Sequence, residues 1–456
     1  MFEPDGNINS GALMLMPFFP YMSENPKGKY MGAFYTGPRD ELLAARNTAW
    51  LGYALCASPV YDVWGPDLCD LLNRVCVNRD FKRLKIGGSR HALFCNDRGQ
   101  LLADGVLMRL DENLYRSYWL APVLSFYVEV MAPKWGLDVH GKWITNDFFI
   151  QIDGPKSLQI MEKAAHKDLH HLKFAQHDHI EIAGQPVTIH RLGMSGCLAY
   201  EMHGDMKYVE DVYGAIYEAG KEFGIRKLSW PNYTLNHTQG GYPNQWIHFR
   251  YPLGESGEEL KKYWESIPET KWGAGLISSF PATGSAADVP DAAYVTPFDV
   301  GWDYLINWDH DFVGKDALAE IAKNPPRKPV TLEWNAEDVG KVFAQQLTNS
   351  AVDPRDDISN VGDNGANFKI HKVMKDGKLV GIASGRIVDF YHHQEISLCW
   401  LDSTLAELGT EVTVIWGTTP GLQSEIRAKV APFPYYNEEM RNETFDVEKI
   451  PHPNFD

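Results

Sequence analysis

The strongest constraint on the fold is a change of pattern at Asn324, where a run of Asn-Pro-Pro-Arg-Lys-Pro begins. Before it, runs that alternate like strands are interleaved with runs of helical spacing, and a similar order occurs twice. After it, mainly short strand-like runs follow, which is typical of a small antiparallel barrel or sandwich. We therefore expect an α+β chain with two pseudo-repeated α+β halves and a β-rich C-terminal part.

At 456 residues the chain is too long for one ordinary core, so several domains are expected. Residues 1–30 are rich in proline and glycine and are interpreted as an N-terminal arm. Residues 31–325 would hold the two halves, as subdomains of residues 31–145 and 146–325. Residues 330–456 would form the C-terminal domain, an antiparallel barrel.

Charge and hydropathy argue against two classes of partner. The net charge of −17 disfavours nucleic acid, because neutralising phosphates needs a basic surface, although a small anionic ligand needs only a local patch. No apolar run is long enough to span a membrane, and the N-terminus lacks the basic region of a signal peptide. The six cysteines include no Cys-x-x-Cys pair, so a reduced, cytoplasmic protein is expected.

Two acids in strand-like runs are candidates for chemistry. Asp104, followed by glycine, could face a cavity, where it would orient an amine nucleophile and balance its positive charge. The alternative is a turn aspartate that caps a strand end. Glu201 could accept two parallel hydrogen bonds from an amino-pyrimidine edge, or it could be an exposed strand residue. Arg191 could hold an anion or pair with a surface acid.

Histidines gather between His166 and His179, where five fall within 14 residues. His166 and His170 have the i,i+4 spacing that could place two metal ligands on one helix face. No H-E-x-x-H motif occurs and no cysteine lies nearby, so solvated histidines are the expected interpretation and no metal site is predicted.

The run Arg191-Leu-Gly-Met-Ser-Gly, followed by Glu201, resembles a folate-site pattern of the aminomethyltransferase family, which includes the T-protein of glycine cleavage. Further stretches similar to that family begin at Gly154, Thr296 and Asp311, and the likeness extends over about residues 35–435. The resemblance implies a tetrahydrofolate cofactor, two folate-binding halves and a C-terminal barrel. It also implies that Asp104 is catalytic and that Glu201 binds the pterin ring, with Arg191, Tyr200 and Trp246 around the cofactor.

Within that family, the stretches from Glu218, Trp308, Val330 and Val414 are most similar to tetrahydrofolate-dependent aromatic O-demethylases of the vanillate and syringate type. The resemblance implies transfer of a methyl group from a methoxyaromatic compound to N5 of tetrahydrofolate, giving a phenol and 5-methyltetrahydrofolate. The expected partner is thus a small-molecule methyl donor, and the expected assembly is a monomer or a homodimer.

A phenolate is a poor leaving group unless it is protonated or hydrogen-bonded, so this chemistry needs a proton donor. Tyr61 and His248 are the favoured candidates. Further residues expected to contact the substrate are Tyr53, Trp230, Arg250 and Tyr251. Where the demethylases carry a carboxylate-binding arginine, this chain has Leu120, so a benzoate-type donor would need Arg116, Arg250 or a histidine as its anchor.

Two alternatives stay open. An N-methyl or sulfonium donor would favour an aromatic box and need no leaving-group acid. A non-catalytic folate-binding protein is the other, since a fold does not guarantee an activity.

Overall fold

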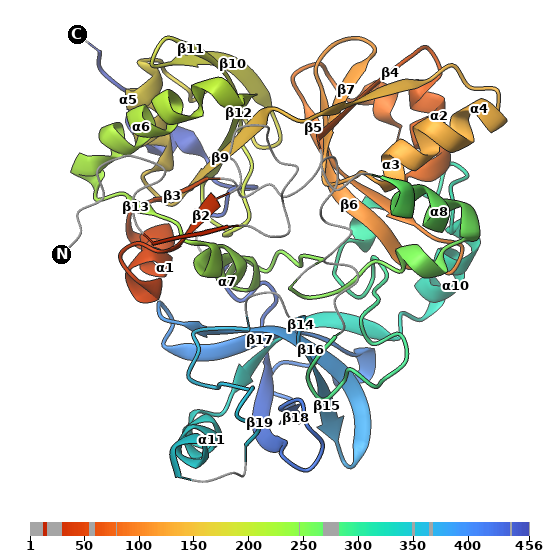
Figure 1. Cartoon of the computed structure of the whole chain (residues 1–456), viewed down its shortest axis with the longest axis vertical. Helices are drawn as coiled ribbons and strands as arrows, with labels where there is room; N and C mark the ends of the chain where they lie inside the picture. The colour runs from red at the N-terminus through yellow and green to blue at the C-terminus, as the bar shows by residue number, and fades with distance from the viewer. Residues whose placement is uncertain are drawn as a thin grey trace.

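Two β-sheets lie side by side, and a closed barrel lies beneath them (Figure 1). The structure is a computed structural model that describes residues 12–15, 30–53, 60–78, 80–245, 247–267, 282–348, 352–363, 368–437 and 440–455. The N-terminal strands β1 (Ala12–Leu15) and β2 (Tyr30–Phe34) form a separate antiparallel pair. No helix of the described residues is both long enough and apolar enough to cross a membrane.

The first sheet has five antiparallel strands. In spatial order they are β5 (Ser89–Cys95), β6 (Leu101–Arg109), β7 (Leu114–Tyr118), β4 (Val60–Trp64) and β8 (His140–Ile144). Helices beside this sheet include α2 (Leu68–Val75), α3 (Val123–Phe126), α4 (Ala132–Lys134), α8 (Glu258–Ser266) and α10 (Lys315–Lys323) (Figure 1). Gly105 in β6 is required by packing, because a Cβ atom there would lie 2.2 Å from the carbonyl oxygen of Tyr118.

The second sheet has six strands. In spatial order they are β10 (His177–Ile182), β11 (Gln185–His190), β12 (Ala199–Asp205), β9 (Asp147–Asp153), β3 (Trp50–Tyr53) and β13 (Arg226–Lys227). On the same side of the molecule as this sheet lie the helices α1 (Pro38–Asn47), α5 (Ser157–Ala165) and α6 (Val209–Gly220) (Figure 1). Strand β3 pairs with β9, so a segment expected in the subdomain of residues 31–145 completes the sheet of the other half. Two separated stretches of the chain therefore build this sheet.

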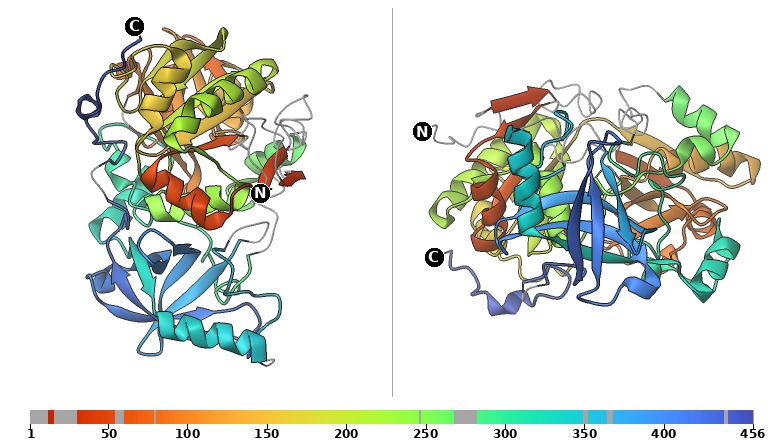
Figure 2. Two further views of the ribbon diagram at one scale, coloured as in Figure 1. Left: turned by 90° about the vertical axis from the view of Figure 1, so that its left-hand side faces the viewer. Right: turned by 90° about the horizontal axis from the view of Figure 1, so that it is seen from below.

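The C-terminal strands form a closed antiparallel barrel, which confirms the barrel expectation. Around it run β14 (Arg327–Trp334), β17 (Gln394–Asp402), β16 (Lys378–Asp389), β15 (Ile370–Lys375), β18 (Glu411–Trp416) and β19 (Ser424–Ala431). The barrel closes where β14 pairs with β19. Helix α11 (Ala336–Thr348) lies outside it (Figure 2).

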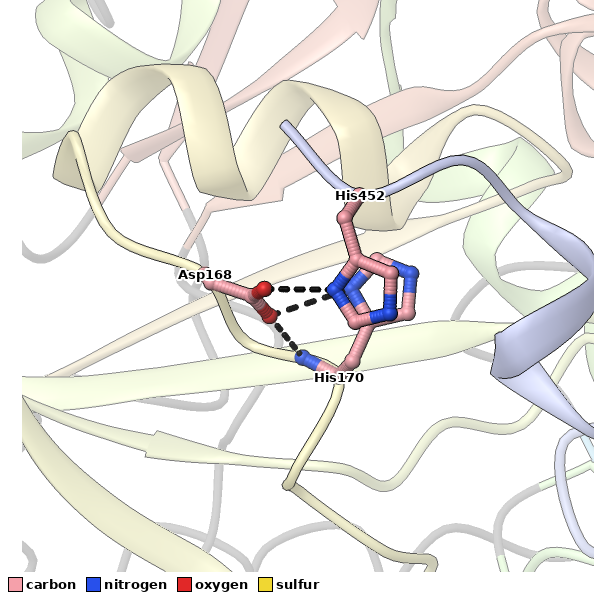
Figure 3. A group of neighbouring side chains, drawn as sticks. All are labelled: Asp168, His170 and His452. Atoms are coloured by element: carbon pink, nitrogen blue, oxygen red, sulfur yellow. Dashed lines mark hydrogen bonds and ion pairs between the residues drawn. The ribbon is translucent and has the colours of Figure 1, made fainter. Parts of the chain in front are cut away.

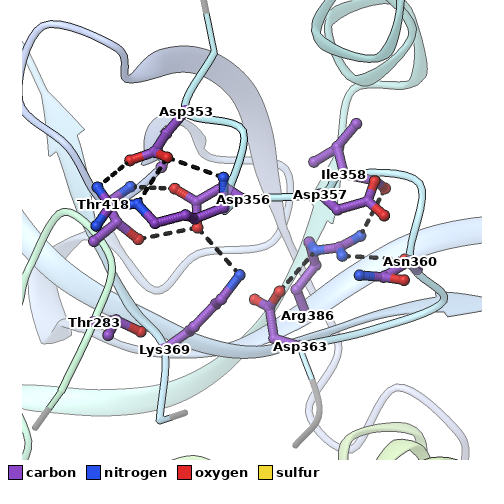
Figure 4. A network of polar contacts seen from close by, with 12 residues as sticks. Thr283, Asp353, Asp356, Asp357, Ile358, Asn360, Asp363, Lys369, Arg386 and Thr418 are labelled. Carbon is purple, nitrogen blue, oxygen red and sulfur yellow. Dashed lines mark hydrogen bonds and ion pairs between the residues drawn. The ribbon is translucent and has the colours of Figure 1, made fainter. Parts of the chain in front are cut away.

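A polar network fastens the segment of residues 352–363 to the barrel (Figure 4). Asp356 accepts hydrogen bonds from the backbone nitrogen of Thr418 at 2.6 Å and from Nζ of Lys369 at 3.2 Å. The buried guanidinium of Arg386 contacts Asp363 at 3.4 Å. Each of these acids thus has a cationic partner, which favours a structural role.

After the barrel the chain returns to the second sheet, so its C-terminus lies beside β10–β12 rather than beside the barrel (Figures 1 and 2). Arg191 fixes this return, because its guanidinium donates to the carbonyl oxygens of Asn442 at 3.1 Å and Phe445 at 2.7 Å. Helix α7 (Trp230–Gly240) lies between the sheets and the barrel (Figure 1).

Candidate functional site

A cavity of about 670 Å³ lies between the two sheets. Strands β5 and β6 supply one wall, β9 and β12 supply the other, and loops around residues 241–251, 300–305 and 433–443 complete it. The wall is rich in aromatic rings: Trp119, Phe149, Phe174, Tyr233, Tyr242, Trp302, Tyr304 and Phe433. The volume lies within the usual range for small-molecule and cofactor sites, and flat apolar walls suit planar ring systems.

Asp104 lies in the cavity wall and is held by Tyr251. The Tyr251 hydroxyl accepts a hydrogen bond from the Asp104 backbone nitrogen at 2.8 Å and donates one to Asp104 Oδ1 at 2.5 Å. Burial, followed by the negative charge of Asp104, raises the pKa of Tyr251 well above its usual value. Tyr251 therefore stays a protonated hydroxyl that fixes the orientation of the carboxylate.

His91 contacts the other oxygen of the same carboxylate. Its Nε2 lies 3.0 Å from Asp104 Oδ2, and because a carboxylate only accepts, Nε2 carries a hydrogen. The ring of Trp302 meets the imidazole edge-on, with 4.7 Å between ring centres. Register explains the contact: β5 pairs Leu93 with Asp104, and His91 lies two residues before Leu93 on the same face.

Glu201 lies in the opposite wall, in β12. Its Oε2 lies 3.5 Å from Nδ1 of His190 and 3.8 Å from Nε2 of His203. Burial alone would favour the neutral acid, but the two imidazoles hold the pKa of Glu201 below its usual value. Glu201 is thus an ionised acceptor facing a cavity whose other wall carries Asp104.

The loop before Glu201 is shaped by close packing. A Cβ atom on Gly193 would lie 2.2 Å from that of Ala199, so only glycine fits there. Buried Asp153 accepts the backbone nitrogen of Ser195 at 3.1 Å, and burial raises the pKa of Asp153 to about 7. Arg46 donates to the Ser195 carbonyl oxygen at 2.7 Å. These contacts fix the turn that leads into β12.

Arg191 and Tyr200 were predicted to bind the cofactor, but the structure places both away from the cavity. The Arg191 guanidinium is directed at the C-terminal segment, as described above, and is buried. Tyr200 alternates with Glu201 along β12, so its side chain points to the opposite face of the sheet and is fully buried in the core. In the described part of the chain, neither residue lines the cavity.

The two predicted proton donors also need correction. Tyr61 is fully buried and donates to Glu129 at 2.9 Å, within the core of the first sheet. His248 is buried, with Nε2 beside Thr238 and Nδ1 accepting from the Asn244 backbone nitrogen, and burial holds its pKa well below the usual value. Neither residue is among the described residues that line the cavity, so neither is positioned to protonate a leaving group there.

One of the predicted substrate residues lines the cavity, and two others are buried elsewhere. Tyr251 lines the cavity, whereas Tyr53 is buried against Tyr213 and contacts the sulfur of Met206 at 3.4 Å. Arg250 is buried over the ring of Phe368, and burial lowers its pKa to about 9. Trp230 begins helix α7, but its side chain is outside the described set, and Trp246 lies outside the described residues altogether.

The two arginines considered as carboxylate anchors are used elsewhere. Arg116 forms a two-pronged pair with Asp62, at 2.7 Å and 2.9 Å. Arg250 is not among the described residues that line the cavity, nor is Arg116. Two histidines line the wall, but His237 donates from Nδ1 to the Tyr242 carbonyl oxygen at 3.0 Å and burial lowers its pKa to about 3, so it is a neutral acceptor and His91 remains for this role.

Sequence reasoning missed some residues of this wall. His91 could have been found from the hairpin register that places it diagonally from Asp104. Trp302 and Phe433 lie in irregular segments far along the chain, and no periodic pattern marks them.

Comparisons with known proteins agree with this geometry. A family model described as the GCVT N-terminal domain matches residues 35–242. Sesamin methylene transferase of Sinomonas sp. is 39% identical over 460 residues, which cover 98% of this chain and 98% of that protein. The chain belongs to the GCVT aminomethyltransferase family.

Another relative and one solved structure are also similar to this chain. Syringate O-demethylase of Sphingobium sp. is 27% identical over 88% of this chain and 89% of its own length. The solved structure of glycine cleavage system aminomethyltransferase T from Bartonella henselae matches with a TM-score of 0.63 at 16% identity, over 92% of this chain and 96% of that chain. The aminomethyltransferase fold and an enzymatic role for this GCVT-family member are therefore established.

Proposed function

We propose that this GCVT-family enzyme moves the methyl group of a methoxyaromatic compound to N5 of tetrahydrofolate, giving a phenol and 5-methyltetrahydrofolate. The observation that carries the proposal is the placement of Asp104 and Glu201 in opposite walls of one aromatic-lined cavity. The likeness to syringate O-demethylase over 88% of the chain supports an aryl ether as the donor.

The walls fit a reduced folate. Glu201 is an ionised strand carboxylate, which can accept two parallel hydrogen bonds from the amino-pyrimidine edge of a pterin. A cavity of about 670 Å³ leaves room for a small donor beside the pterin ring. When bound, tetrahydrofolate supplies the N5 amine that takes the carbon and releases one proton. The departing phenolate takes up one proton, so the proton balance closes.

We propose that the transfer of this proton depends on Asp104, His91 and Tyr251. Tyr251 holds Asp104 Oδ1, which leaves Oδ2 to the Nε2 hydrogen of His91. Asp104 balances positive charge on the amine. His91 would act as an imidazolium with a hydrogen on each nitrogen: it would give its Nδ1 proton to the phenolate oxygen, and the proton that the amine releases would restore it. His91 thus replaces Tyr61 and His248 as the proposed proton donor. Holding both reactants in one cavity supplies much of the remaining acceleration.

A second donor is favoured by one observation, the 39% identity to a protein named sesamin methylene transferase. A methylene carbon held between two aryl oxygens would lose both C–O bonds and form two bonds to folate nitrogens. Two N–H protons would leave and two phenolate oxygens would gain protons, so the balance closes with a diphenol and 5,10-methylenetetrahydrofolate. The same Asp104 and His91 pair would serve both proton transfers.

The test is an anaerobic incubation of the full chain with tetrahydrofolate and a panel of donors. The panel holds methoxyaromatics, methylenedioxyaromatics, betaines and sulfonium acids, and mass spectrometry identifies the folate product. Formation of 5-methyltetrahydrofolate from methoxyaromatics, absent in Asp104→Asn, supports the proposal. Product only from methylenedioxy compounds selects the second donor, and product only from cationic donors overturns both. Folate binding without any product would favour a non-catalytic role.

A further inference from the structure

We propose that His190, Glu201 and His203 form a binding site for one divalent transition-metal ion of the Zn²⁺ class. One ligand atom from each residue lies within 4.8 Å of the other two. The three side chains share one face of the second sheet, because β11 pairs His190 with Glu201 and His203 follows two residues later in β12. Two histidines and one carboxylate are a common ligand set for Zn²⁺ and Fe²⁺.

The tautomer of His190 points to a cation. Ser89 Oγ donates to the carbonyl oxygen of Ala175 at 3.0 Å, so it accepts from Nε2 of His190 at 2.6 Å. With its hydrogen on Nε2, a neutral His190 directs the lone pair of Nδ1 at the Glu201 carboxylate, 3.5 Å away. The positive charge that holds the pKa of Glu201 below its usual value must then be a second proton on this ring or a bound cation. Two acceptors facing each other inside the protein require a positive group between them.

The separations decide between a proton and a metal ion. Nδ1 of His190 and Nε2 of His203 lie 3.5 Å and 3.8 Å from Glu201 Oε2. Hydrogen bonds between nitrogen and oxygen are about 2.7–3.2 Å long, so both contacts are too long for one. Two ligands held about 2.1 Å from Zn²⁺ at the tetrahedral angle lie about 3.4 Å apart, which these distances approach.

Burial and outer contacts fit the same interpretation. His190 is fully buried and His203 is 2% exposed, and both ligand nitrogens lack a hydrogen-bond partner. Nδ1 of His203 lies 3.6 Å from Asp147, which is too long for a hydrogen bond, whereas Nε2 of His190 donates to Ser89 Oγ at 2.6 Å. Metal-bound histidines commonly donate their second N–H to such an acceptor, and this hydrogen bond fixes the orientation of the ring.

Glu201 connects this site to the cavity. Both imidazoles approach its Oε2, so Glu201 would bind the metal through that oxygen and keep Oε1 for a ligand in the cavity. With the metal bound, the pterin would make one hydrogen bond to Oε1 in place of the two parallel bonds that the metal-free carboxylate can accept. The coordination position left open would therefore lie at the wall where the pterin is proposed to bind.

A second cluster of similar composition does not qualify (Figure 3). Nδ1 of His170 contacts Glu162 at 2.8 Å and its Nε2 contacts the Ile450 carbonyl oxygen at 3.0 Å. His452 contacts Asp168 at 2.6 Å and Glu448 at 3.1 Å through its two nitrogens. All four of these ring nitrogens therefore already have an oxygen as hydrogen-bond partner, unlike the ligand nitrogens of His190 and His203. His452 therefore provides a matched control.

The experiment titrates the untagged, chelator-treated full chain with Zn²⁺ and with Co²⁺, without folate or donor. Bound metal is measured after gel filtration, and the Co²⁺ visible spectrum reports the geometry. We expect about one tightly bound ion per chain, with a fall of about tenfold or more in affinity for His190→Ala and His203→Ala. His452→Ala should bind as the unchanged protein does.

Absence of stoichiometric binding, or equal loss in His452→Ala, would overturn the proposal. Should a histidine variant fail to fold, Glu201→Gln, which keeps the size of the side chain, must lose affinity for the site to stand. Because metal content is read without any folate reaction, failure here leaves the proposed function untouched, and failure of methyl transfer leaves the metal site untouched.

Discussion

Replacing Tyr251 with phenylalanine tests how Asp104 is held. The hydroxyl makes two contacts with Asp104, one from the backbone nitrogen at 2.8 Å and one to Oδ1 at 2.5 Å. Hydrogen bonds to a charged group contribute about 1.5–3 kcal/mol. Since about 1.4 kcal/mol corresponds to a factor of ten in rate, loss of the contact to Oδ1 should lower kcat by about 10- to 150-fold.

The assay for Tyr251→Phe is steady-state demethylation, with tetrahydrofolate binding measured separately by calorimetry. Folate affinity should change by less than about threefold, because the pterin contact is assigned to Glu201 and not to Asp104. Tyr115→Phe is the matched control: Tyr115 is also a buried tyrosine, but its hydroxyl donates to the Phe81 carbonyl oxygen away from the cavity. An unchanged kcat in Tyr251→Phe, or an equal loss in Tyr115→Phe, would refute the reasoning.

Three further predictions follow from single contacts. Glu201→Gln should weaken tetrahydrofolate binding by about 10- to 100-fold in calorimetry, because an ionised acceptor is lost, and unchanged affinity would contradict the assignment. Gly105→Ala should destabilise the chain by about 1–3 kcal/mol or more in denaturant unfolding, because the Cβ atom of the alanine would lie 2.2 Å from the Tyr118 carbonyl oxygen. An unaltered unfolding midpoint would argue against this packing. Hydrogen bonds to Asp168 and Glu448 raise the pKa of His452, so His452→Ala should lower the melting temperature most below a pH of about 6.5. The difference in melting temperature should vanish as pH rises through the raised pKa, and a difference that is constant with pH would contradict this prediction.

The barrel was predicted from local pattern, whereas the two acids were singled out by the resemblance to a known family. Most of the regular structure after Asn324 is in strands, with helix α11 between β14 and β15, and the acids lie in strands whose context resembles a known family. Asp104 and Glu201 accordingly both line the cavity.

The proton donors could not be predicted in the same way. Strand β4 lies between two neighbours and Val60–Val63 are buried on both faces, so alternation does not tell which face of Tyr61 meets a ligand. His248 lies in an irregular segment, where no periodicity orients a side chain. Arg191 contacts Asn442, which is 251 residues away, and no spacing in the sequence encodes such a contact.

The most direct measurement of the central claim is a single turnover with a donor whose ether carbon is ¹³C-labelled. Protein, tetrahydrofolate and a labelled methoxyaromatic are mixed without oxygen, and phenol and folate products are quantified together by mass spectrometry. The account predicts one ¹³C-labelled 5-methyltetrahydrofolate for each phenol released. Release of phenol with the label outside the folate, as free formaldehyde or methanol, would contradict it.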